Sequence, residues 1–179
     1  DYFIVAPCKN SSIYVLDQYG NLNFDLNFNS NVSTSVSILN YGNNVNMFAG
    51  FNNGDIIYFD YQGNFEVFSN IGAKVIGEIV FADLNSDTIP EIVAVNTVGE
   101  VHVFDINGAY FSNFPISYEY VFSSSPIIFD IDNDNDLELI AGTTNSIVSI
   151  DIKQQGDVED YWSIYGSNFQ RNSYYYYES

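Results

Sequence analysis

Positively charged residues are scarce in this 179-residue chain, which has 4 Lys and Arg against 23 Asp and Glu and a formal net charge of −19. Nucleic acids and anionic membrane surfaces are bound through basic protein surfaces. The sequence therefore predicts neither of them as a partner. Divalent cations, cationic surfaces and neutral ligands are compatible with its charge.

Cysteines and long apolar runs are also lacking. Cys8 is the single cysteine, so the chain cannot form an internal disulfide. No apolar run approaches the roughly 20 residues of a membrane-spanning helix, and no membrane span is predicted. No charged and then apolar signal peptide opens the sequence. Because it starts directly in a strand-like run at Asp1, we interpret it as a processed or truncated product.

A sustained 3.6-residue apolar period is the third absence, so the sequence predicts no helix. Apolar residues nevertheless make up 46% of the chain, with 15 Tyr and 15 Phe, which suffices for one domain with a sizeable core. Aromatic and β-branched residues favour strands, while Asn and Gly favour the turns between them. The composition thus predicts an all-β fold.

Four segments repeat one pattern, in which an apolar strand, a polar turn and a second apolar strand ending in Asp follow one another. A small residue in the first strand recurs at spacings of 43, 45 and 47 residues, and the strand-ending Asp at 43, 45 and 46. Repeats of about 40–50 residues with four short strands have the size of propeller blades. We therefore predict a β-propeller of four-stranded antiparallel blades, with about four blades in this chain. The recurring positions are Ala6, Ala49, Ala94 and Ala141, and Asp17, Asp60, Asp105 and Asp151.

The predicted blades occupy residues 1–160, and residues 161–179 form a closing segment and tail rich in Trp and Tyr. The sequence opens on the second strand of a blade and ends near the fourth strand of another. We expect either part of a larger ring or a compact four-bladed ring closed by pairing of its two ends. The repeats are placed at about 1–45, 46–90, 91–137 and 138–160.

An acidic stretch from Asp130 to Glu138 separates two apolar runs. Calcium binds six to eight oxygen atoms at about 2.3–2.6 Å, and alternating carboxylates on a tight loop supply such oxygens. The stretch therefore predicts a calcium site, and the alternative is an exposed acidic turn. The predicted ligands are Asp130, Asp132, Asp134 and Glu138 at loop positions 1, 3, 5 and 9, and the backbone carbonyl of Asp136 at position 7.

A second stretch, 47 residues earlier, has oxygen-bearing side chains at the same loop positions and the same apolar flanks. Two copies with matching offsets predict two Ca²⁺ sites, of which the later one binds more tightly because the earlier one has Asn85 in place of a carboxylate. The corresponding loop at 40–44 has no carboxylate, and we interpret it as a copy that has lost the metal. The predicted ligands of the earlier site are Asp83, Asn85, Asp87 and Glu91 and the backbone carbonyl of Ile89.

The motif Asp-x-Asp-x-Asp-x-x-x-Glu, preceded by Ser-Pro-Ile-Ile-Phe and followed by Leu-Ile-Ala-Gly-Thr, resembles the FG-GAP/VCBS repeat of integrin-type and bacterial secreted β-propellers. The resemblance covers residues 1–152. It implies calcium in the blade loops, an extracellular or cell-surface location, and binding or adhesion more often than catalysis. The family usually has Gly at loop position 6, where Asn135 and Thr88 stand here. Of these two, Asn adopts the left-handed conformation more readily.

The resemblance leads to a secreted binding, adhesion or assembly module whose partner is a protein or glycan. The alternative is a propeller-based polysaccharide lyase or hydrolase, since propellers support both kinds of function. With one His and one Arg, the chain has few residues for catalysis, and we predict no enzyme. We interpret His102 as a structural hydrogen-bonding residue and Cys8 as a buried or idle thiol. The aromatic end from Trp162 to Tyr177 is expected to contribute to self-association.

Overall fold

All regular secondary structure in the described chain is β-strand, as the composition predicts. The computed structural model describes residues 2–42 and 44–174, and no helix long and apolar enough to cross a membrane lies among them. The 14 strands form four antiparallel sheets in which neighbours in sequence pair with each other. The first sheet consists of β1 (Phe3–Cys8), β2 (Ser12–Asp17) and β3 (Leu22–Asn27). The second consists of β4 (Ser37–Tyr41), β5 (Asn44–Gly50), β6 (Asp55–Phe59) and β7 (Phe65–Asn70).

The third and fourth sheets continue the series. The third consists of β8 (Val75–Ala82), β9 (Glu91–Asn96), β10 (Glu100–Phe104) and β11 (Ile116–Ser117), and the fourth of β12 (Ile127–Phe129), β13 (Asp136–Gly142) and β14 (Ile147–Gln155). Each of the last three sheets begins with a strand from the end of one predicted repeat and continues with strands of the next. The sequence predicts residues 110–114 as the outer strand of the third sheet, but they form only an isolated bridge between Tyr110 and Phe104. The outer strand of the third sheet is instead the two-residue β11.

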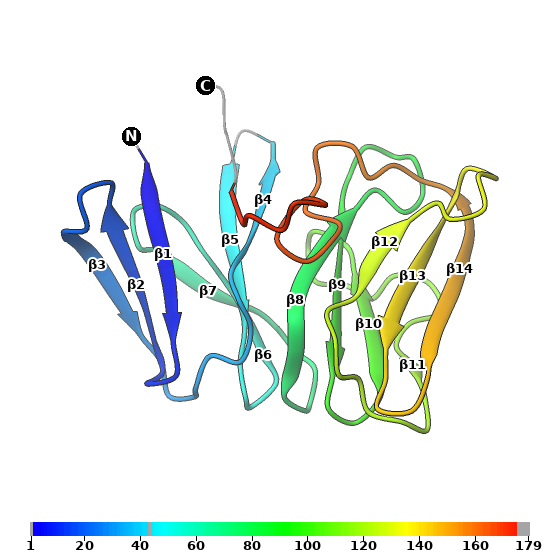
Figure 1. Cartoon of the computed structure of the whole chain (residues 1–179), viewed down its shortest axis with the longest axis horizontal. Coiled ribbons are helices and arrows are strands. Elements are labelled where there is room, and N and C mark those ends of the chain that lie inside the picture. Colours follow the sequence, from blue (N-terminus) through cyan, green and yellow to red (C-terminus); the bar gives the residue numbers. More distant parts are fainter. Residues whose placement is uncertain (1, 43, 175–179) are drawn as a thin grey trace.

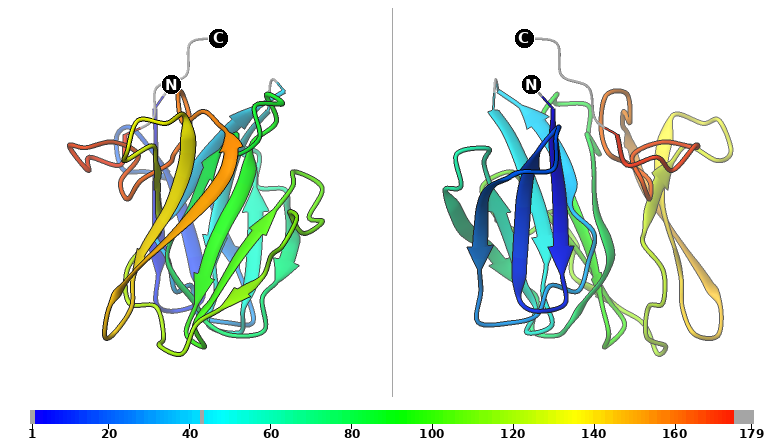
Figure 2. Two further views of the ribbon diagram at one scale, coloured as in Figure 1. Left: turned by 90° about the vertical axis from the view of Figure 1, so that its right-hand side faces the viewer. Right: turned by 60° about the vertical axis from the view of Figure 1, so that its left-hand side comes forward.

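The four sheets stand side by side in an open, propeller-like array (Figure 1). The first and fourth sheets lie at opposite ends of the array, and two further views show the same arrangement (Figure 2). The expected compact ring, closed by pairing of the two ends of the chain, is therefore not what the sheets form. The other expectation, in which these sheets are part of a larger ring, stays a prediction.

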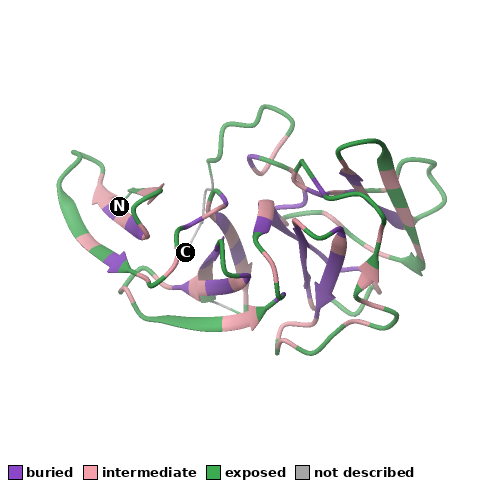
Figure 3. Ribbon diagram, turned by 90° about the horizontal axis from the view of Figure 1, so that it is seen from below, coloured by how far each residue is buried: buried purple, intermediate pink, exposed green. Residues whose placement is uncertain are grey.

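Three apolar clusters fill the spaces between consecutive sheets. Successive side chains of a strand point to opposite faces of its sheet. A sheet in the middle of the array has another sheet against each face, so it buries side chains on both faces. Seen from below, the buried residues are concentrated on the strands in the middle of the array (Figure 3). Burial on this scale, and not any single contact, is the main stabilising contribution.

Residues 157–163 connect the third and fourth sheets. Asp157 and Asp83 exchange backbone hydrogen bonds of 3.0 and 2.8 Å. Further along, the backbone N–H of Phe81 donates to the carbonyl of Trp162 at 3.0 Å, and that of Ile128 to the carbonyl of Ser163 at 2.9 Å. Trp162 is buried in the cluster between the second and third sheets. Burial of Trp162 removes this one residue from a contact between molecules, whereas Phe169 is exposed. The role of the aromatic end in self-association stays a prediction, and Tyr175–Tyr177 lie outside the described residues.

Candidate metal centre

The acidic stretch beginning at Asp130 connects β12 to β13, so two paired strands hold its ends. One carboxylate oxygen from each of Asp130, Asp132 and Glu138 lies within 4.8 Å of the other two. Glu138 is buried on β13 and Asp132 is exposed, so the three groups converge from the sheet and from the loop. Within residues 2–42 and 44–174, this is the one such group of three His, Cys, Asp or Glu side chains.

The Asp130 loop is held in shape by hydrogen bonds from its own backbone. Asp130 accepts from the N–H groups of Asn133 at 2.7 Å and Asn135 at 3.1 Å, and Glu138 accepts from that of Ile131 at 2.8 Å. Asn133 and Asn135 have left-handed backbones, with φ of 64° and 72°. Asn tolerates this conformation, which allows the loop to turn sharply without Gly.

The Asp83 loop between β8 and β9 repeats this geometry. Asp83 accepts from the N–H of Thr88 at 2.7 Å, and Glu91 from that of Leu84 at 2.7 Å, at the same loop positions as in the later copy. Positions 4 and 6 are again left-handed, with φ of 58° at Ser86 and 67° at Thr88. Thr88 thus adopts the conformation for which its β-branched side chain is poorly suited, and the two loops share one backbone shape.

Carboxylates in the Asp83 loop are more deeply buried and less closely gathered. Asp83 and Glu91 are both buried, yet no three acidic side chains of this loop bring one oxygen each within 4.8 Å of one another in the described structure. Burial and the charges of Asp87 and Asp83 raise the pKa of Glu91 to about 7, although the hydrogen bond from Leu84 lowers it. In the other loop, loss of hydration and the charges of Asp134 and Asp130 raise the pKa of Asp132.

The remaining predicted ligands have different surroundings in the two loops. Asp134 and Asp87 each accept a hydrogen bond from the residue two positions later, at 3.0 and 2.8 Å, and the Asn85 side-chain oxygen accepts one from the N–H of Asp87 at 3.0 Å. Asp136 begins β13, and Ile89 lies two residues before β9. The structure therefore brings three of the later loop's predicted side chains together and leaves the earlier set more dispersed.

The loop at 40–44 is a different structure. Asn40 pairs with Val45 and Tyr41 with Asn44, so the ladder between β4 and β5 continues to the turn, although Asn43 lies outside the described residues. The longer loops after β8 and β12 have room for inward-facing oxygens that a tight hairpin lacks. That this copy has lost the metal stays a prediction.

A hollow of about 1000 Å³ lies beside the Asp83 loop and was not predicted from the sequence. The chain from Asp157 to Phe169 lines much of it, and Asn40 and Phe129 lie on other parts of its wall. Its lining combines carboxylates, such as Asp157 and Asp160, with aromatic rings. Burial and the charges of Asp83 and Asp157 raise the pKa of Tyr161, which shows that the surroundings are electronegative. The acidic run 157–160 beside aromatic residues is the sequence signal that could have indicated it.

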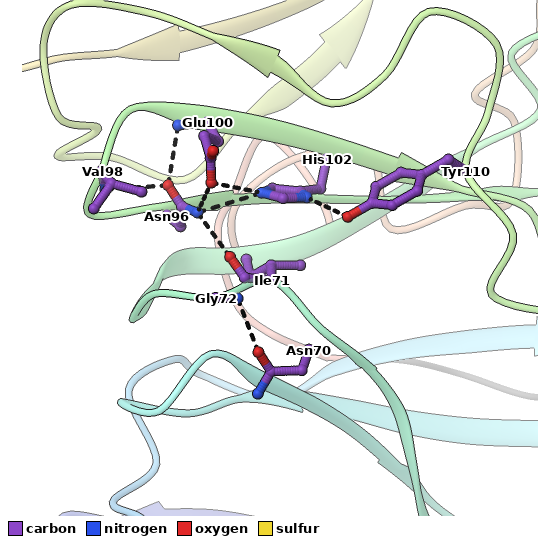
Figure 4. Close-up of polar contacts among 8 residues, drawn as sticks. All are labelled: Asn70, Ile71, Gly72, Asn96, Val98, Glu100, His102 and Tyr110. Carbon is purple, nitrogen blue, oxygen red and sulfur yellow. Dashed lines mark hydrogen bonds and ion pairs between the residues drawn. The ribbon is translucent and has the colours of Figure 1, made fainter.

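His102 lies away from both loops, in a polar network on β9 and β10 (Figure 4). It is buried, with Nδ1 3.1 Å from the hydroxyl of Tyr110 and Nε2 3.3 Å from both Glu100 and Asn96. Burial lowers the pKa of His102, while Glu100 raises it. Asn96 also donates to the carbonyl of Ile71, which ties the network to the preceding sheet. These contacts agree with the predicted structural role.

Comparisons with known proteins show the fold alone. No family model matches the sequence, and no curated protein matches it. Among solved structures, the chain is similar to the computationally designed Ika4 protein, with a TM-score of 0.61 and 16% identity over 84% of this chain and 86% of that one. The designed Ika8 protein has a TM-score of 0.57 and 16% identity over 86% of this chain. BamB from Moraxella catarrhalis, a propeller, has a TM-score of 0.57 and 13% identity over 87% of this chain. The chain spans 44% of Ika8 and 45% of BamB.

Proposed function

We propose that this chain forms blades of a calcium-stabilised β-propeller that acts outside the cell as a binding, adhesion or assembly module. The observation that carries the proposal is the convergence of Asp130, Asp132 and Glu138 in a loop whose backbone shape recurs at Asp83. The two loops connect β8 to β9 and β12 to β13, in neighbouring sheets, and lie at the same edge of the array (Figure 1). A repeated loop with alternating carboxylates is the arrangement that a hard divalent cation favours.

The donor set of the Asp130 loop fits calcium. Oxygens bound to one calcium ion at about 2.3–2.6 Å lie at most about 5 Å apart, and the three converging oxygens are within 4.8 Å of one another. Asp134 and the carbonyl of Asp136 are the further groups assigned to this ion. A bound cation offsets repulsion among the carboxylates. Loss of hydration, and after it the charges of Asp134 and Asp130, raise the pKa of Asp132. We assign calcium the structural role of holding the loop between β12 and β13.

The Asp83 loop is proposed as the weaker second site, with Asp83, Asn85, Asp87, Glu91 and the carbonyl of Ile89 as ligands. Asn85 contributes an uncharged oxygen, and the carboxylates here are further apart. Glu91 in this loop is buried and has a pKa of about 7, so near neutral pH it is protonated in part of the molecules. Calcium binding at this site should therefore release protons, because a carboxylate coordinates a metal in its ionised form.

The proposed partner is a protein or glycan on a surface or in an extracellular assembly. The hollow beside the Asp83 loop supports a binding role, since its acidic and aromatic lining offers hydrogen-bond acceptors next to apolar ring faces. A calcium ion in the adjacent loop would stabilise one wall of this hollow. The location outside the cell, where calcium is abundant, follows from the resemblance of the loops to secreted propellers.

The test is isothermal titration of the chelator-treated protein with calcium, with magnesium as the comparison ion. We expect calcium binding with a dissociation constant of about 10⁻⁴–10⁻³ M, as is typical of extracellular modules, and weaker binding of magnesium, which demands a stricter octahedral geometry. Asp132→Asn should weaken the tighter phase, whereas Glu119→Gln, an exposed site away from the loops, should not. A wild-type protein that takes up no calcium at millimolar concentration would show that the loops are acidic turns.

A further inference from the structure

The sheets pack against one another through corresponding residues. We call the face of a sheet toward the preceding sheet its front, and the opposite face its rear. In each of the last three sheets, two pairs of residues that lie opposite each other on adjacent strands point to the front. These pairs are Met47–Phe59 and Ala49–Ile57 in the second sheet, Ile92–Phe104 and Ala94–His102 in the third, and Leu139–Ile150 and Ala141–Val148 in the fourth.

In the last three sheets, the front is covered by the sheet before it. Met47 and Phe59 belong to the cluster that includes Ile13 and Val15 of the first sheet. The fronts of the third and fourth sheets belong to the two other clusters, each with residues from the sheet before. One arrangement of side chains thus occurs three times in succession.

The first sheet has the same front with no sheet before it. Its pairs are Ile4–Leu16 and Ala6–Tyr14, at the positions equivalent to Met47–Phe59 and Ala49–Ile57. Ile4 is 50% exposed, although its counterparts in the other sheets are buried. Leu22 is opposite Leu16 on β3 and is also exposed. An apolar surface with the pattern of a sheet interface therefore faces solvent at this end of the array.

The fourth sheet leaves the matching rear open at the other end. The rear pairs of the first three sheets include Ile13, Ile56 and Val101, which are buried against the following sheet. The equivalent residue of the fourth sheet is Ile147, which pairs with Gly142 and is 78% exposed. Phe129 lies on the same face, opposite Glu138, and is 42% exposed, although its ring contacts that of Phe169 with centroids 6.1 Å apart.

We propose that two copies of this chain associate head to tail, with the front of the first sheet of each packed on the rear of the fourth sheet of the other. The two open faces correspond to the two halves of an interface that occurs three times within the chain, so a second copy supplies the arrangement that each face lacks. One position of the rear differs, because Ser149 stands where the other sheets have Val15, Tyr58 and Val103. Such a heterologous contact closes into a ring when its rotation permits. The chain spans about half of BamB and of Ika8, so a second copy matches the length that completes a propeller of that size.

The test is sedimentation velocity of the whole chain from about 1 to about 200 µM, a range that covers ordinary dimer affinities. We expect a species of twice the chain mass that increases with concentration. Ile147→Asp should weaken association at least about tenfold, because it puts a charge into an apolar contact. Val98→Asp is the matched control, since Val98 is 58% exposed in the turn between β9 and β10 and lies on neither open face.

Association should strengthen between about 0.05 and 0.5 M salt, because salt screens the repulsion between two chains of net charge −19.

A mixing experiment distinguishes head-to-tail association from contact between two like faces. Ile4→Asp blocks the front and Ile147→Asp blocks the rear, so each variant alone should sediment as a monomer. Their equimolar mixture retains one intact front and one intact rear and should form a heterodimer. A wild-type monomer over the whole concentration range would overturn the proposal. So would a mixture that stays monomeric, or a growing series of species larger than the dimer.

Discussion

The indole N–H of Trp162 donates a hydrogen bond of 2.9 Å to Oε2 of Glu78, which lies 84 residues earlier in the chain. The same oxygen accepts a second hydrogen bond, of 2.7 Å, from the backbone N–H of Gly166. Glu78 is buried on β8, and its other oxygen, Oε1, has no hydrogen-bond partner in the described structure. One carboxylate oxygen therefore holds the segment that connects the third and fourth sheets.

Glu78→Gln should preserve this attachment, because one amide oxygen can accept both hydrogen bonds. Glu78→Leu should leave two buried donors without an acceptor and lower the free energy of unfolding by about 2–4 kcal/mol. Hydrogen exchange provides the local measurement. We expect faster exchange in residues 157–173 of the Leu variant, with β1–β3 unchanged. Equal protection of this segment in the Leu and Gln variants would show that Glu78 does not hold it.

Calcium should stabilise the protein by about 0.4–1.4 kcal/mol per site at about 1 mM free ion, which corresponds to about 1–6 °C in the melting temperature of a chain of this size. Asp130→Ala should reduce this calcium-dependent shift more than Asp83→Ala, because the later loop gathers its carboxylates more closely. The measurement is the difference between melts in millimolar calcium and in EDTA. Asp83 accepts three backbone hydrogen bonds, so its loss should also lower the melting temperature in EDTA. An unchanged wild-type melt in EDTA would contradict the metal assignment of both loops.

Glu91 should make the calcium-free protein less stable as the pH rises. Its folded-state pKa of about 7 lies above the ordinary value of 4.5. The folded state therefore holds this proton more tightly than the unfolded state, and its stabilising effect is complete below pH 4.5 and lost as the pH rises through about 7. Urea unfolding in EDTA at several pH values should show the decline as a difference between wild type and Glu91→Gln. Glu119→Gln is the control, and a difference between wild type and Glu91→Gln that does not vary with pH would be the contrary result.

Gly77 should tolerate no side chain, because it lies where β8 meets the chain that leads into β12. A Cβ at this position would lie 2.3 Å from the Cα of Ser125, and the backbone is left-handed, with φ of 68°. Gly72 has a similar φ of 76° but open space around it. Gly72→Ala should therefore cost about 1–2 kcal/mol from the backbone alone, and Gly77→Ala distinctly more. Urea unfolding of both variants compares the two costs, which should be equal if only the backbone conformation matters.

The candidate metal site shows how far spacing alone can predict geometry. Oxygen-bearing residues at loop positions 1, 3, 5 and 9 predicted two like loops, and the structure has two loops of one shape. Because Asn adopts a left-handed backbone more readily than Thr, the sequence predicted different backbone shapes at Asn135 and Thr88. The two residues instead have nearly the same φ, 72° and 67°. Hydrogen bonds to the Asp83 carboxylate hold Thr88 in this conformation, so the rest of the loop outweighs the local preference.

The sequence by itself determined the strands, their turns and the repeated loops, because apolar alternation and turn residues act between neighbours in the chain. It also specified which residues of each strand are apolar, and hence both faces of every sheet. Only the tertiary structure decided which of those faces are covered. Ile4 and Met47 occupy equivalent positions in their repeats, yet one is exposed and the other buried, since burial depends on whether a sheet lies opposite. The tertiary structure also decided the hydrogen bond between Trp162 and Glu78 and the hollow lined largely by residues 157–169. Both depend on where a distant segment packs, and no local period in the sequence specifies that.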